Sequence, residues 1–128
     1  MALGLSSAEA NEILDAWGNG GSLTPPSNFW IKLHTADPGS AGTTAAATET
    51  TRKEVTWSAA AGGVLSNDAE LSWTNVAGSE DYTHFSVWTA STGGTFLGSG
   101  TVTADAVTAG NTFTIAIGGL DFTLNVAA

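Results

Sequence analysis

The chain contains no cysteine among its 128 residues, so neither a disulfide framework nor a thiolate metal site can form. It has only three basic residues against twelve Asp and Glu, which gives a net charge of −9. Neutralising phosphates requires clustered Lys and Arg, so this balance argues against nucleic acid and anionic membranes as partners. No stretch has the length of a transmembrane span, and the first residues lack the basic and apolar regions of a signal peptide. We therefore expect a protein that is made and folds in a cytoplasm.

Charge of either sign is scarce. Charged residues make up 12% of the chain, about half the usual share. A surface this poor in charge, and rich in Thr, Ser, Ala and Gly, suits a protein that is packed against other subunits. The length matches the usual size of one domain, so we expect a single domain over residues 1–128.

A short helix is predicted from about residue 7 to residue 17. Ser6 has the chemistry of an N-cap, and Glu9, three residues later, completes a capping box. An apolar stripe follows at helical spacing, formed by Ala10, Ile13, Leu14 and Trp17. A helix this short is marginal in water, so the stripe must pack on the rest of the domain or on a neighbour.

After Pro25-Pro26 the pattern is that of short β-strands separated by turns. Their spacing predicts a mainly β fold, an antiparallel β-sandwich of roughly seven or eight short strands behind the N-terminal helix. The segment YTHFSVWTA is the strongest strand, because it carries large groups on both faces, and it should be central. We place Tyr82 and Trp88 together on one of these faces. A long small-residue loop is expected at about residues 37–52.

The segment IKLHTADPG offers the best candidate for chemistry. His34 and Asp37 would need a nucleophile or further ligands, and the only other histidine is His84. A metal site formed by these three residues stays open, but Asp37-Pro38-Gly39 has the composition of a structural turn. We expect no enzyme, no cofactor and no metal.

Arg52 is one of only three cations in an acidic chain. Its guanidinium offers a bidentate fork to a carboxylate. We expect it to pair with Asp37 or Glu49 and so to hold the long loop in place.

Several segments together resemble a family of small structural proteins of tailed actinobacterial phages. They are LGLSSAEANEILDAW (3–17), FWIKLHTADPGSAGT (29–43), ATETTRKEVTW (47–57), DYTHFSVWTASTGGTFLGSG (81–100) and VTAGNTFTIAIGGLDFTLNV (107–126). The strings KLHTADPG and ATETTR are the most specific, because strand and turn composition does not require them. Members of such families are described as tail-fibre, minor tail or capsid-associated proteins, so the resemblance implies a virion protein made in the host cytoplasm.

Within that class the compact acidic domain suggests a capsid decoration protein, which binds the major capsid protein and neighbouring virion subunits on the outside of the shell. A dimer or trimer would suit a symmetric shell. Trp30, beside Lys32 on the polar face of its strand, is the first candidate anchor, with a place in the core as the alternative. Trp17 is the second, although its helical stripe favours the core.

The alternative function is a minor tail or tail-fibre protein that binds a host receptor or glycan. Aromatic rings could stack on sugars, and the candidates are Trp30, Trp57, Trp73 and Trp88.

Overall fold

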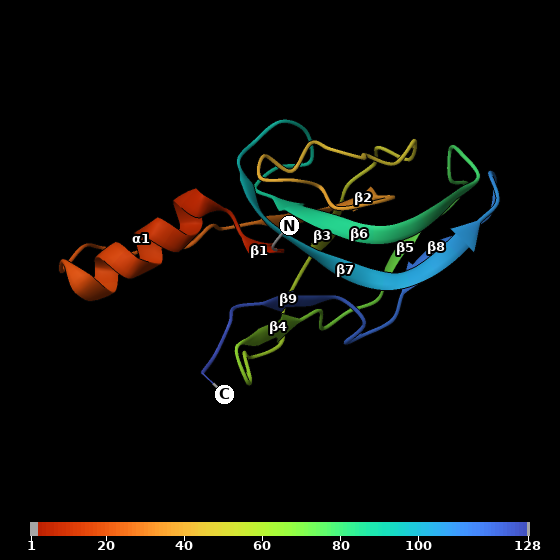
Figure 1. The fold of residues 1–128 in the computed structure, drawn as a ribbon. Coiled ribbons are helices and arrows are strands. Elements are labelled where there is room, and N and C mark those ends of the chain that lie inside the picture. Colours follow the sequence, from red (N-terminus) through yellow and green to blue (C-terminus); the bar gives the residue numbers. More distant parts are fainter. Residues whose placement is uncertain (1–2, 128) are drawn as a thin grey trace.

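The computed structural model describes residues 3–127, which contain one helix and nine strands, all paired antiparallel (Figure 1). This confirms the mainly β fold with one short helix. Helix α1 spans Ser7–Gly18. The strands are β1 (Gly4–Leu5), β2 (Phe29–His34), β3 (Lys53–Val55), β4 (Val64–Ser66), β5 (Leu71–Trp73), β6 (Glu80–Trp88), β7 (Phe96–Val107), β8 (Phe113–Ile115) and β9 (Asp121–Thr123).

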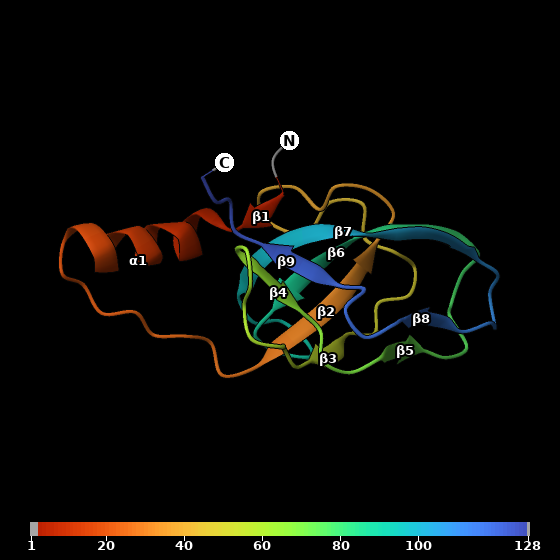
Figure 2. The ribbon, with the colours of Figure 1, turned by 90° about the horizontal axis from the view of Figure 1, so that it is seen from below.

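The strands form two layers. The larger layer is a five-stranded sheet in the order β1-β7-β6-β2-β3, so β6 is its central strand, as the sequence predicts. The second layer consists of two separate two-stranded ladders, β4–β9 and β5–β8. Figure 1 shows β4 and β9 below the large sheet, and Figure 2, seen from that side, shows the two ladders next to each other.

The core lies between these layers. Cross-strand pairing places Ile31 opposite Val87 and Leu33 opposite Phe85, and all four side chains are fully buried. Directly opposed residues share one face of a sheet, so these four form the inner face of the large sheet. The ladders, β7 and the residue just before β9 complete the core with Leu71, Trp73, Val102, Phe113, Ile115, Leu120 and Phe122.

The outer face of the large sheet is covered by the loop of residues 35–52, close to the predicted bounds (Figure 1). His34 and Trp88 lie on this face and are nevertheless buried. Gly42 carries the loop directly over the ring of Phe96: it has φ of +73°, and an added Cβ would lie 2.3 Å from that ring. Only glycine permits both the backbone conformation and the close approach.

One residue of the central strand lies on a different face from the one predicted. A register shift between Tyr82 and His84 interrupts the alternation of β6. The Tyr82 ring packs against Phe113 of the second layer, with 4.9 Å between centroids, so it belongs to the inner core. The prediction that Tyr82 shares a face with Trp88 is wrong, because regular alternation does not continue across this shift in the pairing of β6 with β7.

Helix α1 has nearly the predicted bounds and the predicted N-cap, but only one of the two hydrogen bonds of the predicted capping box forms. The Ser6 hydroxyl accepts the Glu9 amide at 3.3 Å, while the Ser6 amide donates to the Leu97 carbonyl at 2.8 Å. None of the helix residues is buried, and Figures 1 and 2 show the helix extending away from both layers. Within residues 3–127 no helix is long and apolar enough to cross a membrane.

Candidate interaction surface

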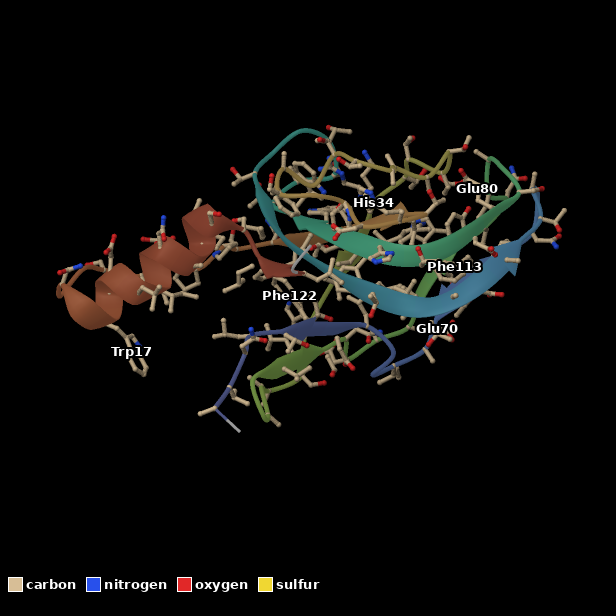
Figure 3. The ribbon with its side chains drawn as sticks, viewed as in Figure 1. Trp17, His34, Glu70, Glu80, Phe113 and Phe122 are labelled. Carbon is tan, nitrogen blue, oxygen red and sulfur yellow. The ribbon has the colours of Figure 1, made fainter. Side chains whose placement is uncertain are left out.

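The apolar stripe of α1 is open to solvent. Trp17 is 89% exposed and Leu14 is 64% exposed. In Figure 3 Trp17 points away from the helix on the side where β4 and β9 lie. Of the two places expected for this stripe, the rest of the domain or a neighbour, the structure excludes a place in the core for both residues. A contiguous patch of large exposed apolar side chains often marks a binding surface, whereas single exposed apolar residues are common on any protein.

The opposite side of α1 is held by polar contacts with the segment that returns to β2. The Glu12 carboxylate accepts the Thr24 amide at 2.8 Å. Asp15 accepts the Asn19 side-chain amide at 3.0 Å, and its carbonyl accepts the Gly21 amide at 3.2 Å. The returning chain therefore covers the acidic side of the helix and leaves the apolar stripe uncovered.

An apolar groove begins at the base of the same helix. It has a volume of about 280 Å³ and is lined by Leu5 and Ile13 on one side and by residues of the β4–β9 ladder, including Leu65, Phe122 and Leu124, on the other. A second hollow of about 270 Å³ continues from Leu5 and Leu124 along the helix to Trp17. We call the combined region the helix–β9 surface, defined by Leu5, Ile13, Leu14, Trp17, Phe122 and Leu124.

The exposed apolar residues of the chain gather at this end of the molecule. Of the seven large hydrophobic residues that are exposed in residues 3–127, six lie in α1, in the returning segment or in the terminal segments beside β1 and β9. They are Leu3, Leu14, Trp17, Leu23, Leu124 and Val126. The seventh, Ile117, lies in the turn between β8 and β9.

The groove residues of β9 were missed as a site because the alternation LDFTLNV predicts an ordinary core strand. Leu120 and Phe122 do lie in the core. The strand ends at Thr123, however, so Leu124 is 49% exposed and Val126 is 64% exposed. The sequence does carry one signal: the apolar alternation continues through Leu124 and Val126, beyond the three residues of β9 that pair with β4.

Trp30 and Lys32, the first predicted anchors, are both only half-buried. Cross-strand pairing places Trp30 opposite Trp88 and Lys32 opposite Ser86, on the face that the 35–52 loop covers. They are thus far less exposed than Trp17. Only Trp17, among the three predicted interface residues, forms part of the helix–β9 surface.

Arg52 has different partners from the predicted carboxylates. Its Nη1 donates to the carbonyls of Ala90 at 2.8 Å and Gly93 at 2.7 Å, in the turn between β6 and β7. The guanidinium also lies over the Trp88 ring, 4.4 Å from its centroid. Arg52 therefore ties the end of the long loop to the β6–β7 turn through carbonyl oxygens and a cation–π contact.

The long loop is held by carboxylates of its own and of β6. Glu49, which is buried, accepts the amides of Thr51 at 3.2 Å and Ala77 at 3.1 Å. Glu80, which is labelled in Figure 3, accepts the amide and hydroxyl of Thr48. The loop is thus anchored by charged acceptors bonded to backbone amides, which are among the stronger hydrogen bonds.

The turn residues Asp37, Pro38 and Gly39 form a structural bend. Asp37 Oδ1 accepts the Gly39 amide at 2.8 Å, and Gly39 has φ of +77°. Pro38 is buried, and its carbonyl accepts the Thr44 amide at 2.9 Å. The carboxylate of Asp37 is therefore used by its own turn.

His34 is fully buried and both ring nitrogens have partners. Nδ1 donates to the Thr44 carbonyl at 2.8 Å, so Nε2 is left to accept from the Ser86 hydroxyl at 2.7 Å. Ser86 Oγ in turn accepts Trp88 Nε1 at 2.7 Å. Burial lowers the pKa of the His34 ring below its usual range, which favours the neutral form that this chain of bonds requires.

The three residues considered for a metal site are not gathered around a common point. His34 is opposite His84 on neighbouring strands, but His84 Nδ1 is bonded to the Thr83 hydroxyl at 2.7 Å. Across residues 3–127, no cluster of three or more His, Cys, Asp or Glu side chains could hold a metal ion.

The tryptophans considered for sugar stacking are mostly internal. Trp73 is 1% exposed and Trp88 is 8% exposed. Trp57 is half-buried between Phe29 and Phe122, at 5.9 and 6.1 Å between ring centroids. Trp57 and Trp73 pack among core residues, whereas Trp88 lies on the outer face against Arg52 and Phe96. None of the three rings presents an open stacking platform.

Residues 3–127 thus form a small, mainly β domain with an uncovered apolar surface. A family model described as Podophage GP4 fiber I protein gp80 matches residues 4–123, and the chain belongs to that family. It is therefore a structural protein of a bacteriophage virion. No curated protein matches the chain. The narrower resemblance to actinobacterial phages stays a prediction.

Proposed function

We propose that this protein is a component of a podophage tail fibre and that it works by binding neighbouring virion subunits, without catalysis. The observation that carries the proposal is α1, whose apolar stripe, with Trp17 89% exposed, is presented outside the domain. Covering such an apolar stripe with a partner removes apolar surface from water, which is energetically favourable. The name of the family, which is a fibre-protein family, favours the tail over the capsid as the place of that contact.

The affinity of such a contact would come from a few aromatic and aliphatic anchors. Trp17 is the strongest candidate, because aromatic residues concentrate binding energy at interfaces. The low charge of the chain fits this role, since few charged groups must lose water when a subunit packs beside it.

Capsid decoration is the competing proposal, with the major capsid protein as partner. Cryo-electron microscopy of virions, combined with quantitative mass spectrometry of their proteins, distinguishes the two. We expect a small number of copies, located in the tail. Density that repeats over the icosahedral shell, with copies close to the number of major capsid subunits, would refute the fibre proposal and support decoration.

A phage that encodes Trp17→Ser tests the role of α1 in the same particles. We expect virions that lack the protein or carry less of it, because its main anchor is lost. The matched control is Ile117→Ser, which removes an exposed hydrophobic residue that is 68% exposed and lies outside the helix–β9 surface. Equal incorporation of the Trp17→Ser protein would contradict the proposal.

A further inference from the structure

We propose that the outer edge of β7 is a second binding site, which takes an extended, basic segment of another protein by adding it to the large sheet as a strand. The site consists of residues 100–107 of β7, which we call the β7 edge, and of the trough beside them. It includes none of the six residues that define the helix–β9 surface. The inference therefore goes beyond the proposed function and gives the chain a second kind of partner.

The first support is that the β7 edge has no neighbouring strand. β1 pairs with β7 only as far as Ser99, so in the described part of the chain no strand lies beside residues 100–107 on this side of the sheet. The Leu97 carbonyl faces this side, because it accepts the Ser6 amide. Backbone groups of alternate residues point the same way along a strand, so the amide and carbonyl of Thr101 also face outward. Such unpaired groups are a template for a further strand.

The second support is that the β7 edge lacks the features that usually protect an edge. The strand at the other edge of the sheet, β3, has only three residues and carries Lys53 and Glu54. Short length and charged side chains discourage pairing with another chain. The β7 edge is longer, contains neither Lys nor Pro, and belongs to a strand that stays continuous from Phe96 to Val107 (Figure 1).

The third support is a trough that runs along this edge, between β7 and the second layer. One part of it, between β7 and β9, has a volume of about 510 Å³, and the next part, between β7 and β8, has a volume of about 380 Å³. Both parts share Val102, Thr103 and Gly119, so they are continuous. An added strand would point alternate side chains into the trough, against Val102 and Ile115, and the others away from it. Strand addition of this kind takes its affinity from main-chain bonds and its specificity from the alternate side chains.

The fourth support is electrostatic, and it defines the chemistry of the partner. The three basic residues of the chain lie in the other half of the sheet, with Lys32 in β2 and Arg52 and Lys53 at β3. Among the described residues that line the trough there is no Lys or Arg, whereas Asp105 and Asp121 both line it. The trough therefore attracts a segment that carries Lys or Arg and repels an acidic one.

The test uses the full-length chain and a fluorescent synthetic peptide, about as long as the β7 edge, that alternates valine or threonine with lysine. Fluorescence anisotropy should show binding with a Kd below about 1 mM. The same peptide with glutamate in place of lysine should not bind. Nuclear magnetic resonance should show slower hydrogen exchange at the Thr101 amide in the bound chain, because that amide enters the new ladder.

Two variants locate the contact. Thr101→Pro removes the outward amide and should weaken binding about fivefold. It leaves the ladder with β6 in place, because that amide faces away from β6, and circular dichroism checks the fold. Asp105→Asn should weaken binding about threefold. Its matched control is Glu54→Gln, which removes one exposed carboxylate at the opposite edge of the sheet and should leave binding unchanged.

A lysine peptide that does not bind below about 1 mM would overturn the inference. Equal binding of the glutamate peptide would refute the basic partner, and binding without slower exchange at Thr101 would refute strand addition. These results are separable from failure of the proposed function. Trp17→Ser should bind the peptide like the wild type, so its normal incorporation into virions would refute the role of α1 and leave the β7 edge untouched.

Discussion

Asn67 is predicted to hold the second layer together, and its replacement tests that role most directly. The residue is fully buried between the two short ladders. Its Nδ2 donates to the carbonyls of Ala69 at 2.8 Å and Ala116 at 3.0 Å, and its Oδ1 accepts the Leu120 amide at 2.9 Å. One side chain thus joins the segment after β4 to the turn that connects β8 and β9.

The substitution Asn67→Leu keeps a side chain of similar size but removes all three bonds. The Leu120 amide is buried, and leaving it unpaired costs about 1–3 kcal/mol. The two carbonyls belong to exposed residues that water can reach, so each loses only the net value of a bond, about 0.5–1.5 kcal/mol. The apolar atoms of leucine offset part of this loss. We expect a decrease of about 2–4 kcal/mol in the free energy of unfolding.

Urea unfolding followed by tryptophan fluorescence measures this change. Because the slope for small proteins is about 1–3 kcal/mol per molar urea, the midpoint should fall by roughly 1–2 M. The matched control is Asn111→Leu, at an exposed position, which should change the free energy of unfolding by less than about 0.5 kcal/mol. Native-state hydrogen exchange should show loss of protection at the Leu120 amide. If Asn67→Leu unfolds within about 0.5 kcal/mol of the wild type, the reasoning fails.

Three further substitutions test other parts of the fold. The folded-state pKa of His34 lies below its unfolded value of about 6.5. Just below that pH the unfolded chain therefore binds more protons than the folded chain. The free energy of unfolding should fall as the pH falls through about 6.5. Urea midpoints measured from pH 7.5 to 5.5 should show this fall in the wild type and a smaller one in His34→Gln. Arg52→Met removes two bonds to turn carbonyls and a cation–π contact, and should lower the free energy of unfolding by about 1–2 kcal/mol while speeding hydrogen exchange in the β6–β7 turn. The Tyr82 hydroxyl is buried without a hydrogen-bond partner, so Tyr82→Phe should leave stability unchanged or raise it by about 1 kcal/mol in thermal unfolding.

Each of these expectations has a result that contradicts it. Equal pH dependence in the wild type and His34→Gln would show that other groups control acid stability. Unchanged exchange in the β6–β7 turn of Arg52→Met would mean that its guanidinium does not hold that turn. A loss of about 1 kcal/mol or more in Tyr82→Phe would show that the hydroxyl has a partner, such as a buried water.

The elements that follow from local chemistry were predictable. The cap at Ser6 and the spacing of the apolar residues locate α1, because both depend on neighbours within a few positions. The apolar content of both faces identifies β6 as the central strand. The bend at Asp37 likewise uses only its own turn.

Features that depend on distant parts of the chain were not predictable. Arg52 was expected to pair with a carboxylate. Its guanidinium instead donates to two carbonyls of the β6–β7 turn, which lies about 40 residues away in the sequence. The place of Tyr82 depends on a register shift in the pairing of β6 with β7. Nothing in the sequence indicates the role of Asn67, because its three hydrogen-bond partners lie in two turns and two of them are about 50 residues away.

The candidate site shows the same division. The sequence by itself determined that α1 would be amphipathic and that the chain would be nearly free of basic charge, because these are properties of composition and spacing. Only the tertiary structure decided that the stripe lies outside the core. β1 pairs with β7 just before the helix begins, β9 ends at Thr123, and Trp17 is left 89% exposed. An amphipathic pattern has an apolar face that is stabilised when it is covered, and the arrangement of the strands in residues 3–127 leaves Leu14 and Trp17 of that face exposed.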